Sequence, residues 1–157
     1  MFTRRILFVA TTLAALAGCA TPSTPSSVAD TIAAKPQLST LNSLVAKAGL
    51  TATLQGTGPF TIFAPSNEAF AKVPAKTMNE LASDPAKLKA VLTYHVLPGK
   101  VMAADVKNGN IKTVHGANLA LAKAGDYVTV EEALVQTADI SATNGVVHVI
   151  DSVLTPP

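Results

Sequence analysis

The chain has 157 residues, of which 48% are apolar and 14% are charged, and its formal net charge at pH 7 is +2. This length and composition are typical of one globular domain. Both arginines lie in residues 1–18, which carry no other charge, so the rest of the chain has 10 scattered lysines (12 − 2) against 10 acidic residues. We therefore expect no nucleic-acid partner, because phosphate binding needs a basic excess or a basic face.

Residues 1–18 predict a secretory signal peptide. Arg4 and Arg5 precede an uncharged run from Ile6 to Leu16, which is too short for a permanent membrane-spanning helix. The run ends in "LAGC" (residues 16–19), which resembles the lipobox of bacterial lipoproteins, in which cleavage precedes a cysteine that is then acylated. We expect lipidation of Cys19, the only cysteine; the alternative is ordinary cleavage near residue 20 with no lipid.

Residues 19–27 are rich in Ser, Thr and Pro and predict an extended tether between the lipid anchor and a folded domain over residues 28–156. A short helix is expected over residues 28–34. A second helix is expected within residues 37–50, where Gly49 supplies the stop and apolar residues recur at helical spacing, namely Leu38, Leu41, Leu44, Val45 and Ala48.

The stretch "GPFTIFAPSNEAF" (residues 58–70) predicts a turn, a strand over 60–64 and the start of a helix. A catalytic serine at such a strand-to-helix turn needs glycine two positions before and after it, but Ser66 has Ala64 and Glu68 there. We therefore interpret Ser66 as a helix N-cap, with Glu68 in the first turn, where the helix dipole favours an acid.

The middle of the chain continues the helical pattern. A short helix is expected over residues 77–82, and Asp84 followed by Pro85 predicts the start of another, because an acid caps the first turn and proline suits its first position. The apolar face of that helix runs from Leu88 to His95, where we expect it to end. "VLPGKV" (residues 96–101) then turns the chain into its second half.

From residue 110 the pattern changes to that of strands. Short apolar or alternating runs occupy residues 111–114, 119–123, 127–130, 132–136, 138–141 and 146–150, with turn residues between them, as in an antiparallel sheet. Asn144-Gly145 predicts a type I′ hairpin turn. Helices followed by strands favour the α+β class over an alternating parallel sheet.

Three segments, in this order and at this separation, resemble the fasciclin-type (FAS1) domain: "GPFTIFAPSNEAF", "YHVLPG" (residues 94–99) and "ADISATNGVVHVIDSVLTPP" (residues 138–157). The resemblance covers residues 28–156. It implies an α+β wedge of two short antiparallel β-sheets with a helical layer, and a secreted or membrane-anchored adhesion module.

The same resemblance implies candidate adhesion residues. The family's Tyr-His pair falls on Tyr94 and His95, and the Asp-Ile pair of some animal relatives falls on Asp139 and Ile140. The flanks of the second pair, "TADIS", depart from those relatives, and the chain has no Arg-Gly-Asp triplet. We therefore expect no integrin-like partner.

The titratable residues do not suggest a reaction centre. His95, His115 and His148 are far apart in sequence and lack metal-site spacing, so no metal or cofactor is expected. We interpret His95 as a buried helix-end residue that donates to a backbone carbonyl. Glu131 and Glu132 are adjacent, and in a strand or bulge their carboxylates would point to opposite faces.

We therefore predict a non-catalytic, monomeric module that is lipid-anchored in the cell envelope, in the outer membrane if the source has two membranes, and that mediates cell-surface or cell-matrix contacts. A periplasmic or secreted location is the alternative. The expected partner is a surface protein or a glycan, bound weakly or multivalently because aromatic residues are few. The alternative function is an envelope enzyme or small-ligand carrier, which needs a deep polar pocket with two histidines or with Ser66 beside His95.

Overall fold

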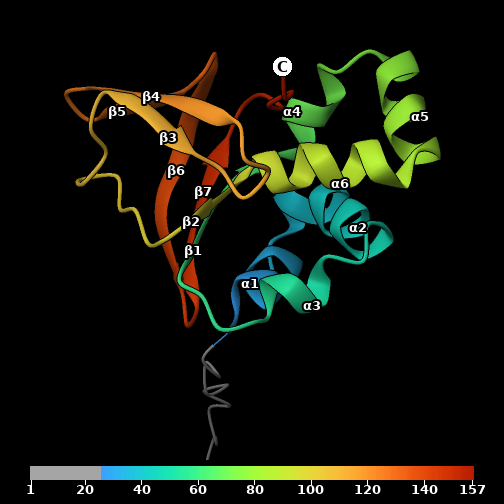
Figure 1. Ribbon diagram of the computed structural model, residues 1–157, viewed down its shortest axis with the longest axis horizontal. Helices are drawn as coiled ribbons and strands as arrows, with labels where there is room; N and C mark the ends of the chain where they lie inside the picture. The colour runs from blue at the N-terminus through green and yellow to red at the C-terminus, as the bar shows by residue number, and fades with distance from the viewer. Residues whose placement is uncertain (1–25) are drawn as a thin grey trace, which may run out of the picture.

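The computed structural model of the protein describes residues 26–157 (Figure 1). The predicted signal peptide, Cys19 and most of the predicted tether lie outside the described residues. The helices are α1 Val28–Ala33, a 3₁₀ turn at Pro36–Leu38, α2 Ser39–Lys47, α3 Thr51–Leu54, α4 Asn67–Ala71, α5 Ala75–Ser83 and α6 Pro85–Tyr94. In this part of the chain, none of them is long and apolar enough to cross a membrane.

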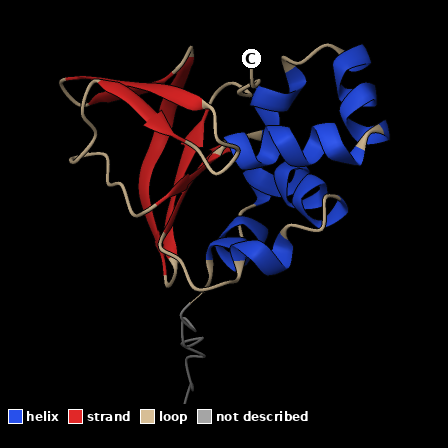
Figure 2. Cartoon of the chain, in the orientation of Figure 1, coloured by secondary structure: helices blue, strands red, loops and turns tan. Residues whose placement is uncertain are grey.

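The strands are β1 Phe60–Pro65, β2 Val96–Pro98, β3 Gly109–Lys112, β4 Asn118–Ala124, β5 Tyr127–Val130, β6 Ala133–Ala142 and β7 Gly145–Ile150. They form a curved sheet in the order β2-β1-β7-β6-β5-β4-β3, and the helices gather on one side of it (Figure 2). The α+β class and the helical layer beside the strands are confirmed.

Two details of the expected sheets differ. The two sheets are joined through β6, whose first residues pair with β5 and whose remainder pairs with β7 across register shifts on either side of Thr137. These bulges bend one long strand where the sequence suggested two short ones. The pairing of β1 with β7 is also parallel, from Phe60 opposite Gly145 to Pro65 opposite Ile150. Parallel pairing is accessible here because a long stretch of chain separates the two strands.

Buried apolar side chains of the described residues form two hydrophobic clusters, one on each face of β7. The helix-side cluster includes Val147 and Val149, and the strand-side cluster, inside the curve of the sheet, includes Ile150. β7 is buried at every position, as expected for a central strand covered on both faces. The His148 ring stacks on Phe63 of the strand-side cluster. His148 therefore lies on the face of β7 opposite to Val147 and Val149, as the alternation of the sequence predicts.

The predicted helix starts are confirmed. The Ser66 hydroxyl accepts a hydrogen bond from the backbone N–H of Ala69 at 3.2 Å, which makes it the N-cap of α4. Asp84 caps α6 by accepting from the backbone N–H groups of Ala86 and Lys87 at 3.0 and 3.2 Å, with Pro85 in the first turn.

The predicted type I′ turn is wrong, although the hairpin exists. Ala142 pairs with Gly145, and neither Asn144 nor Gly145 has a positive φ. A side chain at Gly145 would overlap the carbonyl oxygen of Phe60, so glycine is needed here for a close approach of two strands. The Asn144 amide accepts from the backbone N–H of Val28 and donates to the carbonyl oxygens of residues 54 and 56, each at 2.8 Å.

Candidate functional site

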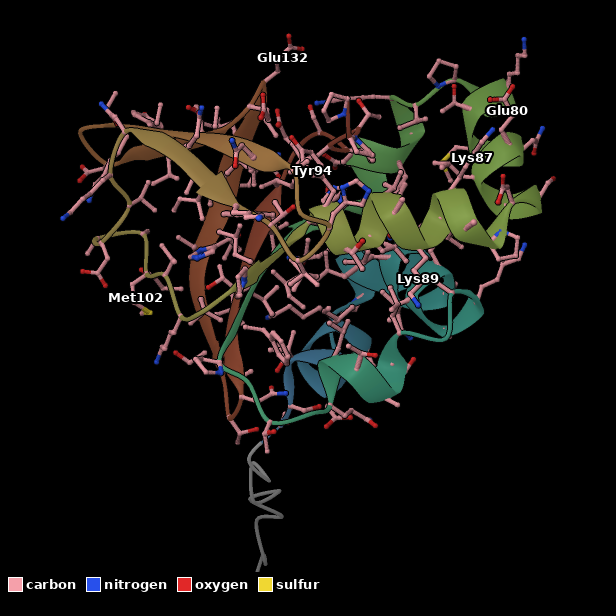
Figure 3. The ribbon with its side chains drawn as sticks, viewed as in Figure 1. Glu80, Lys87, Lys89, Tyr94, Met102 and Glu132 are labelled. Atoms are coloured by element: carbon pink, nitrogen blue, oxygen red, sulfur yellow. The ribbon has the colours of Figure 1, made fainter. Side chains whose placement is uncertain are left out.

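Tyr94 is the last residue of α6, and its ring lies in the strand-side cluster with 2% of the residue exposed. Its hydroxyl is within donating distance of the carbonyl oxygen of Asn118 at 3.0 Å and of Oε1 of Glu131 at 3.3 Å. Burial raises the pKa of Tyr94, and the nearby Glu131 carboxylate raises it further. Figure 3 shows Tyr94 where the helical layer meets the strands. The residue therefore joins α6 to β4 and to the turn after β5.

That turn contains Glu131 and Glu132, where the sequence suggested a strand or a bulge. Glu131 has φ 54°, and its carboxylate accepts from the backbone N–H of Ala120 at 2.9 Å as well as from Tyr94. The chain reverses at these residues, so both of them line one open hollow of about 480 Å³, together with Tyr94 and Ser152. Glu132 projects outward at the rim (Figure 3).

His95 follows α6 directly and is buried, with 2% of the residue exposed. Its Nε2 accepts the backbone N–H of Leu154 at 3.0 Å, so Nδ1 carries the hydrogen and donates to the carbonyl oxygen of Val91 at 2.7 Å. Burial lowers the pKa of His95 to about 4, and the bond to Val91 only partly opposes that shift. The predicted inward donation to a carbonyl is confirmed, and both ring nitrogens are used.

Asp139 lies in a bulged part of β6 with φ 58°. Its Oδ1 accepts from the backbone N–H of Ala103 at 2.8 Å, and its own backbone N–H donates to Nδ1 of His148 at 3.2 Å. The His148 Nε2–H donates in turn to the carbonyl oxygen of Val101 at 2.8 Å. Burial lowers the pKa of His148, and the bond to Val101 and the Asp139 charge oppose this less strongly. Asp139 and His148 together hold residues 99–103, which we call the 99–103 loop.

A buried threonine completes this set of contacts. The Thr61 hydroxyl of β1 donates to the carbonyl oxygen of Gly99 at 2.7 Å and accepts from the backbone N–H of Val101 at 2.8 Å. Three strands therefore each supply one side chain that fixes the 99–103 loop. Thr61 and His148 were not among the predicted site residues, because nothing in the sequence pairs either of them with residues 99–103.

The structure places the two predicted pairs in different surroundings. Tyr94 and His95 contact β4, the turn after β5 and the C-terminal segment. Asp139 contacts the 99–103 loop, and Ile140 pairs with Val147 and packs on the helix-side cluster. Their contacts therefore do not define one shared surface.

In the part of the chain that the structure describes, the surroundings of Ser66 do not contain the histidine that a serine reaction centre needs. Ser66 lines a hollow of about 330 Å³ with residues 37, 67, 68, 136 and 149, and none of these described residues is a histidine. Among residues 26–157, no group of three His, Cys, Asp or Glu side chains could hold a metal ion. Ser66 therefore acts as a helix cap in the arrangement that the structure describes.

Comparison with known proteins gives consistent matches. The family profile described as Fasciclin domain matches residues 36–156. Protein sll1483 of Synechocystis sp. is 42% identical over 132 residues, which cover 83% of this chain and 73% of that protein. Cell surface glycolipoprotein MPB83 of Mycobacterium bovis is 37% identical over 135 residues, which cover 83% of this chain and 60% of that protein. A solved FAS1 domain pair from the insect cell adhesion molecule fasciclin I matches with a TM-score of 0.66 at 19% identity, over 83% of this chain and 51% of that one.

Proposed function

This chain belongs to the fasciclin domain family, and we propose on that basis that it is an extracytoplasmic interaction module that mediates cell-surface or cell-matrix contacts and catalyses no reaction. A relative named as a cell surface glycolipoprotein and a structural neighbour named as a cell adhesion molecule support this reading. The proposed partner is a surface protein or a glycan, bound by a monomeric domain.

One observation carries the non-catalytic part of the proposal. The polar side chains that stand out in the family resemblance are each engaged with backbone groups: Tyr94 and His95 tie α6 to its neighbours, and Asp139 holds the 99–103 loop. A general base or nucleophile needs a free lone pair or proton that faces a substrate. Both ring nitrogens of His95 are occupied, and its residue is only 2% exposed.

We further propose that a lipid on Cys19 holds the domain at the membrane. The "LAGC" segment and the printed name of the mycobacterial relative support this anchor. The described chain starts beside the hairpin of β6 and β7, where the backbone N–H of Thr143 donates to the carbonyl oxygen of Ser26 at 3.0 Å. That end of the domain lies away from the C-terminus (Figure 1). A tether that joins the domain there leaves the opposite end, with α5 and the turn after β5, free of the attachment point.

The test is a gain-of-adhesion assay with the full-length chain. Non-adherent bacterial cells that export the chain with its own first 19 residues should bind to a matrix-coated surface or to one another more than cells with an empty vector do. A destabilised variant, Leu92→Asp in the helix-side core, serves as the unfolded control. Equal adhesion of all three strains, with the intact chain present in the envelope, would contradict the proposal.

A further inference from the structure

The outward face of β4 carries alanine at three alternating positions. Ala120, Ala122 and Ala124 are exposed, while Leu119 and Leu121, which alternate with the first two of them, are buried in the strand-side cluster. Alanine is depleted in strands, where β-branched and aromatic residues are favoured. Strand formation therefore does not explain three exposed alanines in a row. Their common property is a short side chain that leaves the sheet surface flat.

The neighbouring strands extend this flat area. Tyr127 lies opposite Ala124 and Thr129 opposite Ala122, and Leu134 of β6 lies opposite Thr129. We call these six residues the alanine–tyrosine face: Ala120, Ala122, Ala124, Tyr127, Thr129 and Leu134. Tyr127 is 68% exposed and Leu134 37%, and only one other large hydrophobic residue among residues 26–157, Val114, is exposed. Exposed apolar surface is therefore concentrated on this face, and β4 and β5, which carry most of it, lie in the part of the sheet away from the helices (Figure 1).

The rim of the face is polar and the centre is uncharged. Asn110 of β3 lies opposite Ala120, and Asn118 begins β4; both residues are exposed. Their side-chain amides have no hydrogen-bond partner among the described residues, so they can both donate and accept. None of the six side chains of the face is charged, and its rim carries one exposed base, Lys112 opposite Asn118, and one exposed acid, Asp126 beside Tyr127.

We propose that the alanine–tyrosine face binds a neutral saccharide chain. The exposed ring of Tyr127 stacks on the C–H face of a sugar ring, the alanines let the next sugar lie flat on the sheet, and the rim amides bond to its hydroxyl groups. This inference rests on the proposed function and names the partner class and the contact surface.

Size and charge favour a saccharide over a protein. A stable protein–protein interface uses about 20–30 residues on each side, several times the size of this face. The centre of the face is uncharged and its rim has one base and one acid, so it lacks the cluster of like charges that selects and steers charged protein partners or anionic polymers. A single tyrosine gives weak binding to each chain, and many copies held on one membrane would supply avidity.

The inference is tested by co-sedimentation of the purified full-length protein with insoluble cellulose, chitin and mannan. Tyr127→Ala and Ala122→Glu should each weaken retention on the bound polysaccharide about five- to tenfold, because the first removes the stacking ring and the second puts a long charged side chain on the flat centre. Tyr127→Phe keeps the ring and should retain binding. Ala46→Glu, at an exposed alanine of α2, is the matched control and should bind like the parent.

The results separate this inference from the proposed function. Absence of binding to all three polysaccharides, or unchanged binding by folded Ala122→Glu, overturns the saccharide site. A concentration-dependent dimer that Ala122→Glu abolishes also overturns it, because a second copy would then cover the face. If Tyr127→Ala leaves cell adhesion unchanged while Leu92→Asp abolishes it, the alanine–tyrosine face is not the contact surface, and the proposed adhesive function still holds.

Discussion

His95 links the end of α6 to the C-terminal segment, because its Nε2 accepts the backbone N–H of Leu154 at 3.0 Å inside the protein. The bond exists only while the ring is neutral. Protonation would place a second N–H against the Leu154 donor and would bury a charge. The pKa of His95 is lowered to about 4 because burying the charged ring costs free energy.

Acid should therefore destabilise the domain through His95. Its pKa is about 4 when folded, against about 6.5 when unfolded, so the unfolded chain binds more protons between these values. The contribution of the neutral His95 to the free energy of unfolding is fully present above pH 6.5 and is lost as the pH falls towards 4. The loss amounts to about 3 kcal/mol. Urea unfolding at pH 7.5, 5.5 and 4 measures it. His95→Gln, which cannot titrate, should show a shallower pH dependence, and an unchanged dependence in that variant would contradict the assignment.

Tyr94 should contribute mainly to stability. Tyr94→Phe removes the hydrogen bonds to Asn118 and Glu131 and should lower the free energy of unfolding by about 1 kcal/mol, whereas Tyr94→Ala should cost about 3–5 kcal/mol as a large-to-small core change. Adhesion should fall only as far as the folded fraction does. A Tyr94→Ala protein with an unchanged melting temperature and no adhesion would instead make this residue a contact surface.

Asp139 should act by holding the 99–103 loop. Asp139→Asn keeps an acceptor for the Ala103 N–H and a residue type that tolerates positive φ, so it should be nearly neutral. Asp139→Ala removes the acceptor and strains the backbone, and it should increase amide hydrogen exchange in residues 99–106 with a stability loss of about 1–2 kcal/mol. If exchange in the loop stays at the parent rate, the side chain does not hold it.

Asn144 should be among the polar residues least tolerant of change. Asn144→Asp keeps the acceptor for the Val28 N–H but places a carboxylate against two carbonyl oxygens, and it should cost about 2–4 kcal/mol in thermal or urea unfolding. Asn108→Asp is the matched control, because Asn108 is exposed and uses only its oxygen, to accept from the backbone N–H of Lys123. Equal stability of the two variants would count against this role of Asn144.

The anchor prediction concerns Cys19, outside the described residues. Cys19→Ser removes the thiol that would be acylated, so the protein should move from the membrane fraction to the soluble envelope fraction, and its mass should lack the lipid. Thr21→Ser, which leaves the cysteine intact, is the control. Co-fractionation of Cys19→Ser with the parent would rule out lipid anchoring.

Sequence reasoning succeeded where structure is set locally. Ser66 and the Asp84-Pro85 pair were assigned as helix starts from their immediate neighbours, and both bond as expected. One-turn α3 and three-residue β2 were not predicted, because neither is long enough to show a period. β2 also depends on its pairing with β1, which is a tertiary contact.

The long-range links could not be inferred from the same patterns. Asn144-Gly145 looked like a type I′ turn, yet the asparagine binds three distant backbone groups and the glycine makes room for β1. The alternation of apolar and polar residues placed His148 on the correct face of β7, but it gave no indication that the ring bonds to the carbonyl oxygen of Val101. Periodicity specifies which face is buried, and it leaves open which distant backbone group meets a given side chain.

The parallel pair of β1 and β7 has a consequence for biogenesis. β7 lies between β1 and β6 in the sheet, yet it is the last of the described strands to be synthesised. A nascent or truncated chain that stops before Gly145 has two unpaired strand edges in place of the sheet centre, and such edges recruit other chains. Closing contacts between distant segments is also slow. The centre of the sheet therefore cannot close before β7 has been synthesised, and until then the facing edges of β1 and β6 stay open to other chains.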